Sequence, residues 1–244
     1  MPTRDEYKQV ALRVLRPHVA SPATAWRGVY QLLLWFQDGL PHIIEADQLL
    51  RPKWTSRAAA VRDALAQEFG CAPDKVVEEV DLLLKSEIFT RAPQRQNPLG
   101  IGFVTSLLLL LEHFSSRHYA YFTEEAIGEV VFRGIREAPR SKPDIVVGHK
   151  GSEIALISAK WSLRHDRLKD LKDECAYFKT LVPRLKFYVV TNEFSPARLD
   201  KVISDYRIDR VFHVCRRLVV DVAQVDGRTD QLSDLSDLLE LFAA

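Results

Sequence analysis

The sequence has few cysteines, and those present are poorly placed for a disulfide framework or a zinc site. Cys71, Cys175 and Cys215 are odd in number and far apart, with no Cys-x-x-Cys pair and no histidine at zinc-ligand spacing. This pattern excludes a disulfide-rich secreted domain and a zinc finger, and it favours a reducing, cytoplasmic compartment. The 10 glycines and 12 prolines among 244 residues are also too few for a fibrous or low-complexity chain.

Long hydrophobic runs are absent as well. The longest run, Val104 to Leu111, has Thr105 and Ser106 inside it and is too short to span a bilayer. The opening residues, MPTRDEYKQV, contain no apolar stretch of the kind that a signal peptide carries. We therefore expect a soluble cytoplasmic protein that does not enter a membrane.

What the sequence does contain is the composition of an ordinary folded protein. It is 47% hydrophobic and 27% charged, and it is long enough for one large domain or two small ones. The net charge is only +1, so no global excess of charge points to nucleic acid. Between Phe132 and Lys172, however, ten basic and five acidic residues give a local charge of +5, which would attract a phosphate backbone.

Residues 1–95 are predicted to form a helical N-terminal region. Apolar residues recur every three or four positions in four segments, which predicts helices at residues 7–15, 25–36, 56–69 and 74–84. The last two, followed by a basic stretch with a proline at residues 89–95, have the order of a winged helix-turn-helix. A helical subdomain that packs against the rest of the chain or builds a dimer fits the same pattern.

Residues 96–244 are predicted to form an α/β domain. A long apolar helix is expected from residue 99 to about 114, with later helices at about 164–181 and 196–206. Segments rich in valine and isoleucine predict strands at residues 130–135, 144–147, 153–158, 187–191 and 211–215. Three consecutive strands followed by alternating helices and strands imply a mixed central sheet with helices on both faces.

The candidate catalytic residues stand at the ends of two neighbouring strands. Asp144 follows a proline at the start of one strand, Lys160 ends the next, and a turn at residues 149–151 would join the strands as a hairpin. Adjacent strand ends would bring the two side chains close together. The carboxylate can then bind a divalent metal, while the ammonium group orients or activates a water and offsets charge on a phosphate.

Asp144 and Lys160, with Ser158 two residues before the lysine, resemble the PD-(D/E)xK nuclease superfamily. That superfamily usually has an acidic residue where this chain has Ser158. In the branch of restriction endonucleases that recognise a CCGG-type core, a serine stands there and a glutamate of the following helix supplies the missing carboxylate. Glu174, which thirteen residues separate from Lys160, has the spacing of that branch.

A third element of the resemblance is an Arg-x-Asp-Arg recognition motif, which the same branch places four residues after the lysine. Here Arg164, His165, Asp166 and Arg167 begin four residues after Lys160. Arginine can donate two hydrogen bonds to O6 and N7 of guanine, and aspartate can accept one from N4 of cytosine. The motif is therefore predicted to read neighbouring G·C pairs.

The resemblance implies a Mg²⁺-dependent type II restriction endonuclease with a PD-(D/E)xK core over roughly residues 130–215. Asp144 and Glu174 would bind the metal, and Lys160, together with Ser158, would complete the catalytic group. The substrate would be double-stranded DNA with a palindromic CCGG-type or CCNGG-type site, cut by a homodimer or a tetramer. A cognate DNA methyltransferase is the expected companion.

The residues alone leave several alternatives open. The catalytic aspartate could merely cap a turn, and the arginines could lie on a solvated first helical turn. Asp170 and Asp173 lie on the same predicted helix as Glu174, and Glu112 or Glu129 could add another active-site carboxylate. A repair or junction nuclease would use the arginines on phosphates, whereas a non-enzymatic DNA-binding protein would carry a degenerate nuclease fold.

Overall fold

The computed structural model describes residues 20–29, 98–123, 143–161, 163, 165–193, 195–216 and 232–243. The chain divides into two compact units, residues 1–109 and 110–244, and helix α7 (Pro98–Phe114) crosses the division. α7 agrees with the long helix predicted there. Several predictions lie outside the described residues: the helices at 7–15, 56–69 and 74–84, the winged helix-turn-helix, the boundary after residue 95 and the strand at 130–135.

In the first unit, the described residues include the start of the helix predicted from residue 25. A turn of 3₁₀ helix, η2 (Pro22–Thr24), leads into helical residues 25–29. The Thr24 hydroxyl donates to the Ser21 carbonyl over 3.1 Å, which closes the turn before the helix begins. Trp26 is buried, so the helix presents an apolar face.

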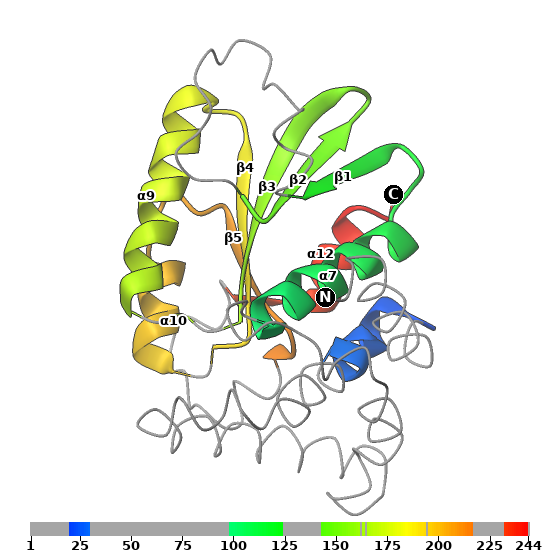
Figure 1. The fold of residues 1–244 in the computed structure, drawn as a ribbon, viewed down its shortest axis with the longest axis horizontal. Coiled ribbons are helices and arrows are strands. Elements are labelled where there is room, and N and C mark those ends of the chain that lie inside the picture. Colours follow the sequence, from blue (N-terminus) through cyan, green and yellow to red (C-terminus); the bar gives the residue numbers. More distant parts are fainter. Residues whose placement is uncertain are drawn as a thin grey trace, which may run out of the picture. The chain divides into compact units, whose positions relative to one another are not determined.

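The second unit contains a six-stranded mixed sheet with the strand order β1-β2-β3-β4-β5-β6 (Figure 1). The first three strands pair antiparallel, and β3 to β6 pair parallel. The predicted mixed sheet is therefore confirmed. The strands are β1 (Tyr119–Thr123), β2 (Ile145–His149), β3 (Ser152–Lys160), β4 (Lys186–Thr191), β5 (Arg210–His213) and β6 (Leu232–Asp234).

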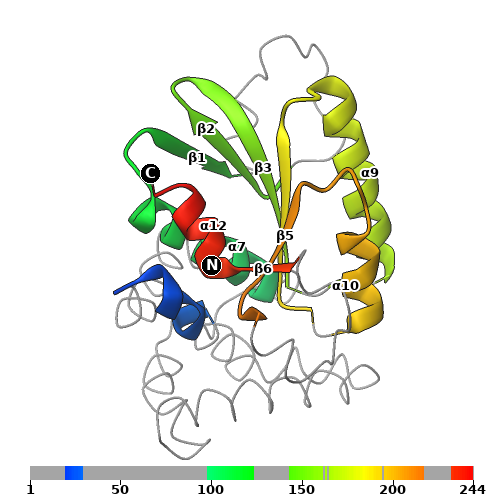
Figure 2. The same cartoon turned by 180° about the vertical axis from the view of Figure 1, so that it is seen from behind.

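Helices cover both faces of this sheet, as predicted. α9 (His165–Leu181) and α10 (Pro196–Ile203) lie on one face, and α12 (Leu235–Leu241) lies on the other (Figure 1 and Figure 2). No helix in the described ranges is long and apolar enough to cross a membrane.

The alternation of side chains along β4 accounts for this two-sided arrangement. Phe187 and Val189 belong to the core cluster that contains the buried side chains of α9 and α10. Tyr188, which points the other way, contacts Phe242 directly after α12, with ring centroids 6.4 Å apart. One short strand therefore supplies apolar side chains to both layers.

The apolar face of α9 holds this helix against the sheet. Leu168, Leu171, Cys175 and Phe178 recur at intervals of three and four residues, and all are buried in one cluster with strand residues such as Leu156. Burial of a large apolar side chain of this kind stabilises the fold by about 1.5 to 3 kcal/mol. The orientation of α9 about its axis is thus fixed by packing.

β2 and β3 are joined by the turn predicted at residues 149–151. Lys150 (φ 52°) and Gly151 (φ 76°) both have positive φ, and His149 pairs with Ser152 across the two-residue loop. This backbone is that of a type I′ hairpin turn, whose twist matches the twist of the strands. The turn helps to fix which residues of β2 and β3 lie opposite each other.

The sequence did not predict β1, β6 or α12. β1 is rich in aromatic residues and its burial does not alternate, so it lacks the period of a strand that faces a core on one side. β6 has only three residues and pairs with the end of β5, so it depends on a distant partner. α12 follows directly and starts with a capping box, in which the Asp234 carboxylate accepts from Ser236 N and the Asp237 carboxylate from Asp234 N.

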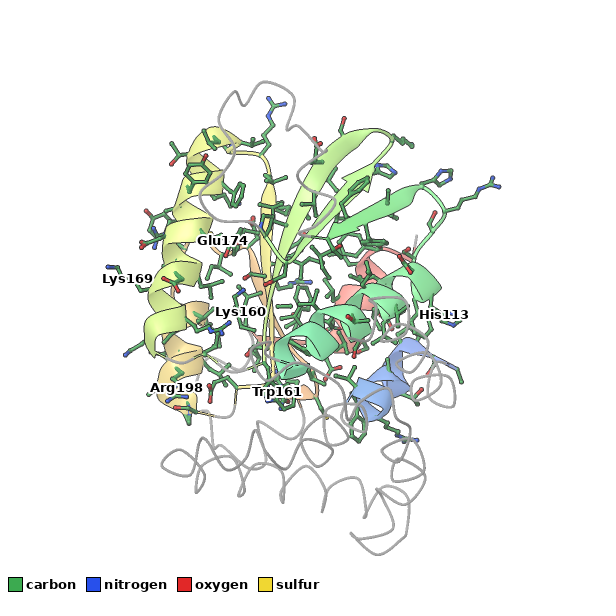
Figure 3. The ribbon with its side chains drawn as sticks, viewed as in Figure 1. His113, Lys160, Trp161, Lys169, Glu174 and Arg198 are labelled. Atoms are coloured by element: carbon green, nitrogen blue, oxygen red, sulfur yellow. The ribbon has the colours of Figure 1, made fainter. Side chains whose placement is uncertain are left out.

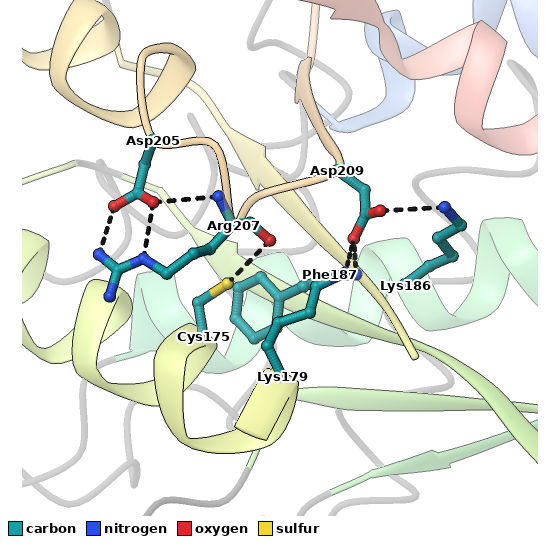
Figure 4. Close-up of polar contacts among 7 residues, drawn as sticks. All are labelled: Cys175, Lys179, Lys186, Phe187, Asp205, Arg207 and Asp209. Carbon is teal, nitrogen blue, oxygen red and sulfur yellow. Dashed lines mark hydrogen bonds and ion pairs between the residues drawn. The ribbon is translucent and has the colours of Figure 1, made fainter. Parts of the chain in front are cut away.

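Two aspartates hold the loop between α10 and β5 (Figure 4). Asp205 accepts two hydrogen bonds from the Arg207 guanidinium, at 2.8 Å from Nε and 2.7 Å from Nη2. Asp209 accepts from the backbone N–H of Phe187 at 2.7 Å and forms an ion pair with Lys179 of α9. The loop is therefore tied to both α9 and β4.

The two cysteines that the structure describes, Cys175 and Cys215, are both buried. Cys175 donates to the carbonyl of Arg207 over 3.2 Å (Figure 4). Burial raises the pKa of its thiol to about 12, so Cys175 stays protonated at neutral pH. It acts as a packing residue rather than as a nucleophile.

Replacing Asp205 by asparagine is expected to lower the free energy of unfolding, because the ionised carboxylate favours the folded state. The hydrogen bonds from Arg207 lower the pKa of Asp205 from 3.8 to about 2, and this difference corresponds to about 2 kcal/mol at neutral pH. The stabilisation is fully present above pH 3.8 and is lost as the pH falls through about 2. The difference in free energy of unfolding between wild type and Asp205→Asn, measured by urea denaturation, should therefore be larger at about pH 7 than at about pH 3.

The control for this measurement is Asp170→Asn, at an exposed position of α9. It should change the free energy of unfolding by less than about 0.5 kcal/mol at either pH. A gap between wild type and Asp205→Asn that stays constant on acidification would show that ionisation of Asp205 is not its source.

Candidate active site

Strand geometry places Asp144, Ser158 and Lys160 on one face of the sheet. Val146 and Leu156 belong to the core cluster that α9 covers, and side chains two residues apart on a strand share a face. Asp144 stands two residues before Val146, and Ser158 and Lys160 stand two and four residues after Leu156. All three therefore lie on the side of the sheet that α9 covers.

The Asp144 carboxylate is the centre of this group. Its Oδ2 atom accepts from Lys160 Nζ at 2.6 Å, from Ala159 N at 2.8 Å and from Ser158 Oγ at 3.4 Å. The side chains of Lys160 and Asp144 are 16% and 21% exposed, so the ion pair remains open to a ligand from solvent. The structure thus brings together the aspartate and the lysine that the sequence placed at neighbouring strand ends.

Glu174 lies on the face of α9 that packs on the sheet. It is three residues after Leu171 and four before Phe178, both of which are buried, and it is itself only 5% exposed. Asp170 and Asp173, the other acidic residues of this helix, are exposed. In Figure 3, Glu174 points from α9 toward the sheet whose strand β3 ends at Lys160.

The Asp144 carboxylate keeps one oxygen available for a metal ion. Oδ2 of Asp144 is occupied by its three donors, whereas no donor among the described residues reaches Oδ1. Nowhere in the described part of the chain do three or more His, Cys, Asp or Glu side chains form a metal-binding group. Mg²⁺ is typically held by only one or two protein carboxylates together with waters and substrate phosphates, so a site that offers few protein carboxylates is compatible with this ion.

The predicted recognition motif is described only in part. Arg164 lies outside the described residues, as do the side chains of His165 and Asp166, which begin α9. Arg167 is half-buried in the first turn of this helix. Leu163, directly before the motif, is fully buried in the core.

A buried glutamate, which the sequence did not single out, lies at the same end of the sheet. Glu193 follows Thr191, the last residue of β4, and Thr191 pairs with Lys160 in the neighbouring strand. The carboxylate of Glu193 accepts from the backbone N–H of Leu163 at 2.9 Å and from Arg198 Nη1 at 3.2 Å. The available signal was a polar Thr-Asn-Glu triplet at the carboxyl end of a buried strand, where α/β sheets place their ligand sites.

The two further glutamates considered for the active site differ in position. Glu112 is exposed near the end of α7 and lines an open surface pocket of about 240 Å³ with residues 115–117 and 119–121. Neither Asp144 nor Lys160 lines this pocket. Glu129 lies outside the described residues.

The comparisons with known proteins give structural likeness alone. No family model and no curated protein matches the sequence. A solved complex of restriction endonuclease PspGI with substrate DNA is similar to this chain, with a TM-score of 0.50 and 14% sequence identity, over 100% of this chain and 93% of that chain. Two structures of metal-depleted Ecl18kI with uncleaved DNA have TM-scores of 0.38 and 0.39 at 15% identity, covering 98% of this chain and 83% of theirs. The likeness to PspGI shows that this chain has a restriction-endonuclease fold.

Proposed function

We propose that this protein is a type II restriction endonuclease, which uses Mg²⁺ to cleave double-stranded DNA at a specific palindromic site. The observation that carries the proposal is the 2.6 Å contact between Lys160 Nζ and Asp144 Oδ2 at adjacent strand ends, in a fold shared with restriction endonuclease PspGI. Glu174, buried on the helix facing this side of the sheet, supports it further.

In the proposed mechanism each polar group has a separate task. Asp144, through Oδ1, and Glu174 would hold the metal, which when bound supplies Lewis-acid stabilisation of negative charge on the scissile phosphate. Lys160 would orient the attacking water and offset charge that develops on the phosphate. Ser158, buried beside Asp144, would keep the aspartate in place by donating to Oδ2.

We further propose that Arg164, His165, Asp166 and Arg167 read a CCGG-type or CCNGG-type site in the major groove. A palindromic site has twofold symmetry, so a homodimer with one active site for each strand is the natural assembly, with a tetramer as its extension. A cognate methyltransferase would protect the host DNA at the same site.

The decisive test is to incubate the protein with phage DNA and Mg²⁺ and to sequence the ends of the fragments. A restriction endonuclease gives discrete fragments whose ends share one short palindrome containing CCGG or CCNGG. A repair or junction nuclease would leave plain duplex DNA uncut or cut it without a common sequence. Intact DNA at every Mg²⁺ and Mn²⁺ concentration would overturn the proposed activity.

Arg164→Ala is expected to weaken specific DNA binding by about 1 to 3 kcal/mol and to relax discrimination at one G·C position, because one bidentate base contact is lost. Binding in Ca²⁺ should be measured on the specific site and on a set of singly substituted sites. A uniform loss on all sequences, together with a smaller dependence on salt, would instead identify Arg164 as a phosphate contact.

A further inference from the structure

The segment between the catalytic lysine and the recognition motif is short. Only residues 161–163 separate Lys160 from Arg164, so the position of this segment sets where the motif begins relative to the catalytic group. Trp161 is half-buried, and the side chain of Leu163 is fully buried among core residues of α9 and the sheet. The core therefore holds one side of the segment.

Glu193 holds the backbone of the same segment. Its Oε2 atom accepts from Leu163 N at 2.9 Å and from Arg198 Nη1 at 3.2 Å, and its Oε1 atom accepts from Ser195 N at 2.9 Å. The three donors belong to the segment after β3, to the first turn of α10 and to the residue that precedes α10. One carboxylate thus joins the ends of β3 and β4 to the start of α10.

The carboxylate that receives these contacts is shielded from water, although the arginine that pairs with it is partly exposed. The Glu193 side chain is 0% exposed, and that of Arg198, which lies at the start of α10 in Figure 3, is 32% exposed. A buried carboxylate is costly unless it is paired and hydrogen-bonded, and here one arginine and two backbone N–H groups satisfy it. An amide in its place would keep only one acceptor oxygen and would direct an NH₂ group at one of these donors.

We propose that Glu193 is a positioning residue for DNA sequence discrimination, acting by fixing Leu163 and hence the start of the Arg164–Arg167 motif relative to Lys160. This inference rests on the proposed restriction activity. Glu193 does not touch the reacting atoms. It holds the three-residue segment that links the catalytic lysine to the motif that reads the bases. Its removal should therefore loosen the choice of site more than it impairs the cleavage chemistry.

The structural part of the inference can be tested without DNA. In protein labelled with ¹⁵N-leucine, the Leu163 amide should exchange with solvent as slowly as leucine amides of the core, such as that of Leu156. In Glu193→Gln, exchange at Leu163 should accelerate at least tenfold while Leu156 changes little. A Leu163 amide that exchanges in the wild type as fast as that of an exposed loop overturns the inference, whether or not the variant folds.

The functional part is tested by the ratio of kcat/KM for the specific site to kcat/KM for singly substituted sites. In Glu193→Gln this ratio should fall about tenfold or more, which is the size of one lost base contact. Arg198→Met, which removes a half-exposed partner of the same carboxylate, should lower the ratio in the same direction. Asp205→Asn is the matched control, because it alters another buried carboxylate that is paired with arginine but lies outside this segment.

These experiments distinguish a failure of the proposed restriction activity from a failure of the proposed role of Glu193. If the wild type cuts no DNA, the proposed function fails and the inference with it. If the wild type cuts specifically and Glu193→Gln discriminates as well as it does, only the inference fails. An equal loss of discrimination in Glu193→Gln and Asp205→Asn also overturns the inference, because general destabilisation of the protein would then explain the loss in both variants.

Discussion

Lys160→Ala is expected to slow DNA cleavage by on the order of 10²- to 10⁴-fold, because the variant lacks the ammonium group that orients water and offsets charge on the phosphate. Binding of the specific site in Ca²⁺ should survive, since the recognition motif is unchanged. Lys160 donates to Asp144 over 2.6 Å, so the variant also leaves that carboxylate without its cation. Stronger metal binding at Asp144 should accompany the loss of cleavage.

The measurement is single-turnover cleavage of a duplex that carries the specific site, with binding followed separately by fluorescence anisotropy. Lys169→Ala is the matched control, because Lys169 is an exposed lysine of α9 that points into solvent (Figure 3). It should cut at the wild-type rate within about twofold. Equal cleavage by Lys160→Ala and wild type would remove Lys160 from the mechanism.

The same pair of variants separates the proposed enzyme from a DNA-binding protein with a degenerate nuclease fold. In such a protein Lys160→Ala leaves DNA binding unchanged and removes no activity, because no reaction depends on the lysine. Single-turnover rates decide between the two.

The parts of the fold that the sequence predicted are those fixed by neighbours in the chain. The turn at residues 149–151 follows from Gly151 and its positive φ, and the strands on either side follow from their runs of valine and isoleucine. Together these signals were enough to place Asp144 opposite the end of β3. Local sequence signals were therefore enough to predict that Asp144 and Lys160, the central pair of the candidate site, lie close together.

The parts that the sequence missed depend on partners far along the chain. β6 becomes a strand by pairing with β5, across residues 214–231, and β1 pairs with β2 although its own burial pattern does not alternate. Glu193 accepts from Leu163, which is 30 residues earlier. No periodicity or motif in the sequence predicts such contacts between distant residues, so only the three-dimensional structure reveals them.

The choice among the acidic residues of α9 also needed the structure. Spacing along the sequence left Asp170, Asp173 and Glu174 as alternatives, because all three lie within about one turn of one another. Packing of Leu171 and Phe178 against the sheet rotates α9 so that Glu174 is buried, whereas both aspartates face solvent. This orientation favours Glu174 as the second carboxylate of the proposed metal site.

Glu174→Gln is accordingly expected to reduce cleavage by about 10²-fold or more and to raise the Mg²⁺ concentration needed for half-maximal cleavage at least tenfold. The amide keeps the size of the side chain but not its negative charge, so metal affinity falls while packing beneath α9 is preserved. Mg²⁺ titrations of the single-turnover rate, together with calorimetric titration of Mg²⁺ into the protein and a duplex with a non-cleavable linkage, measure both effects.

Asp173→Asn is the matched control for this experiment. It also replaces a carboxylate by an amide, but one residue away on the exposed side of the helix. It should leave the rate and the Mg²⁺ dependence within about twofold of wild type. If Asp173→Asn were the damaging variant and Glu174→Gln the silent one, the metal would have to approach α9 from its solvent face. That face is turned away from Asp144 and Lys160, and the two-carboxylate site would have to be abandoned.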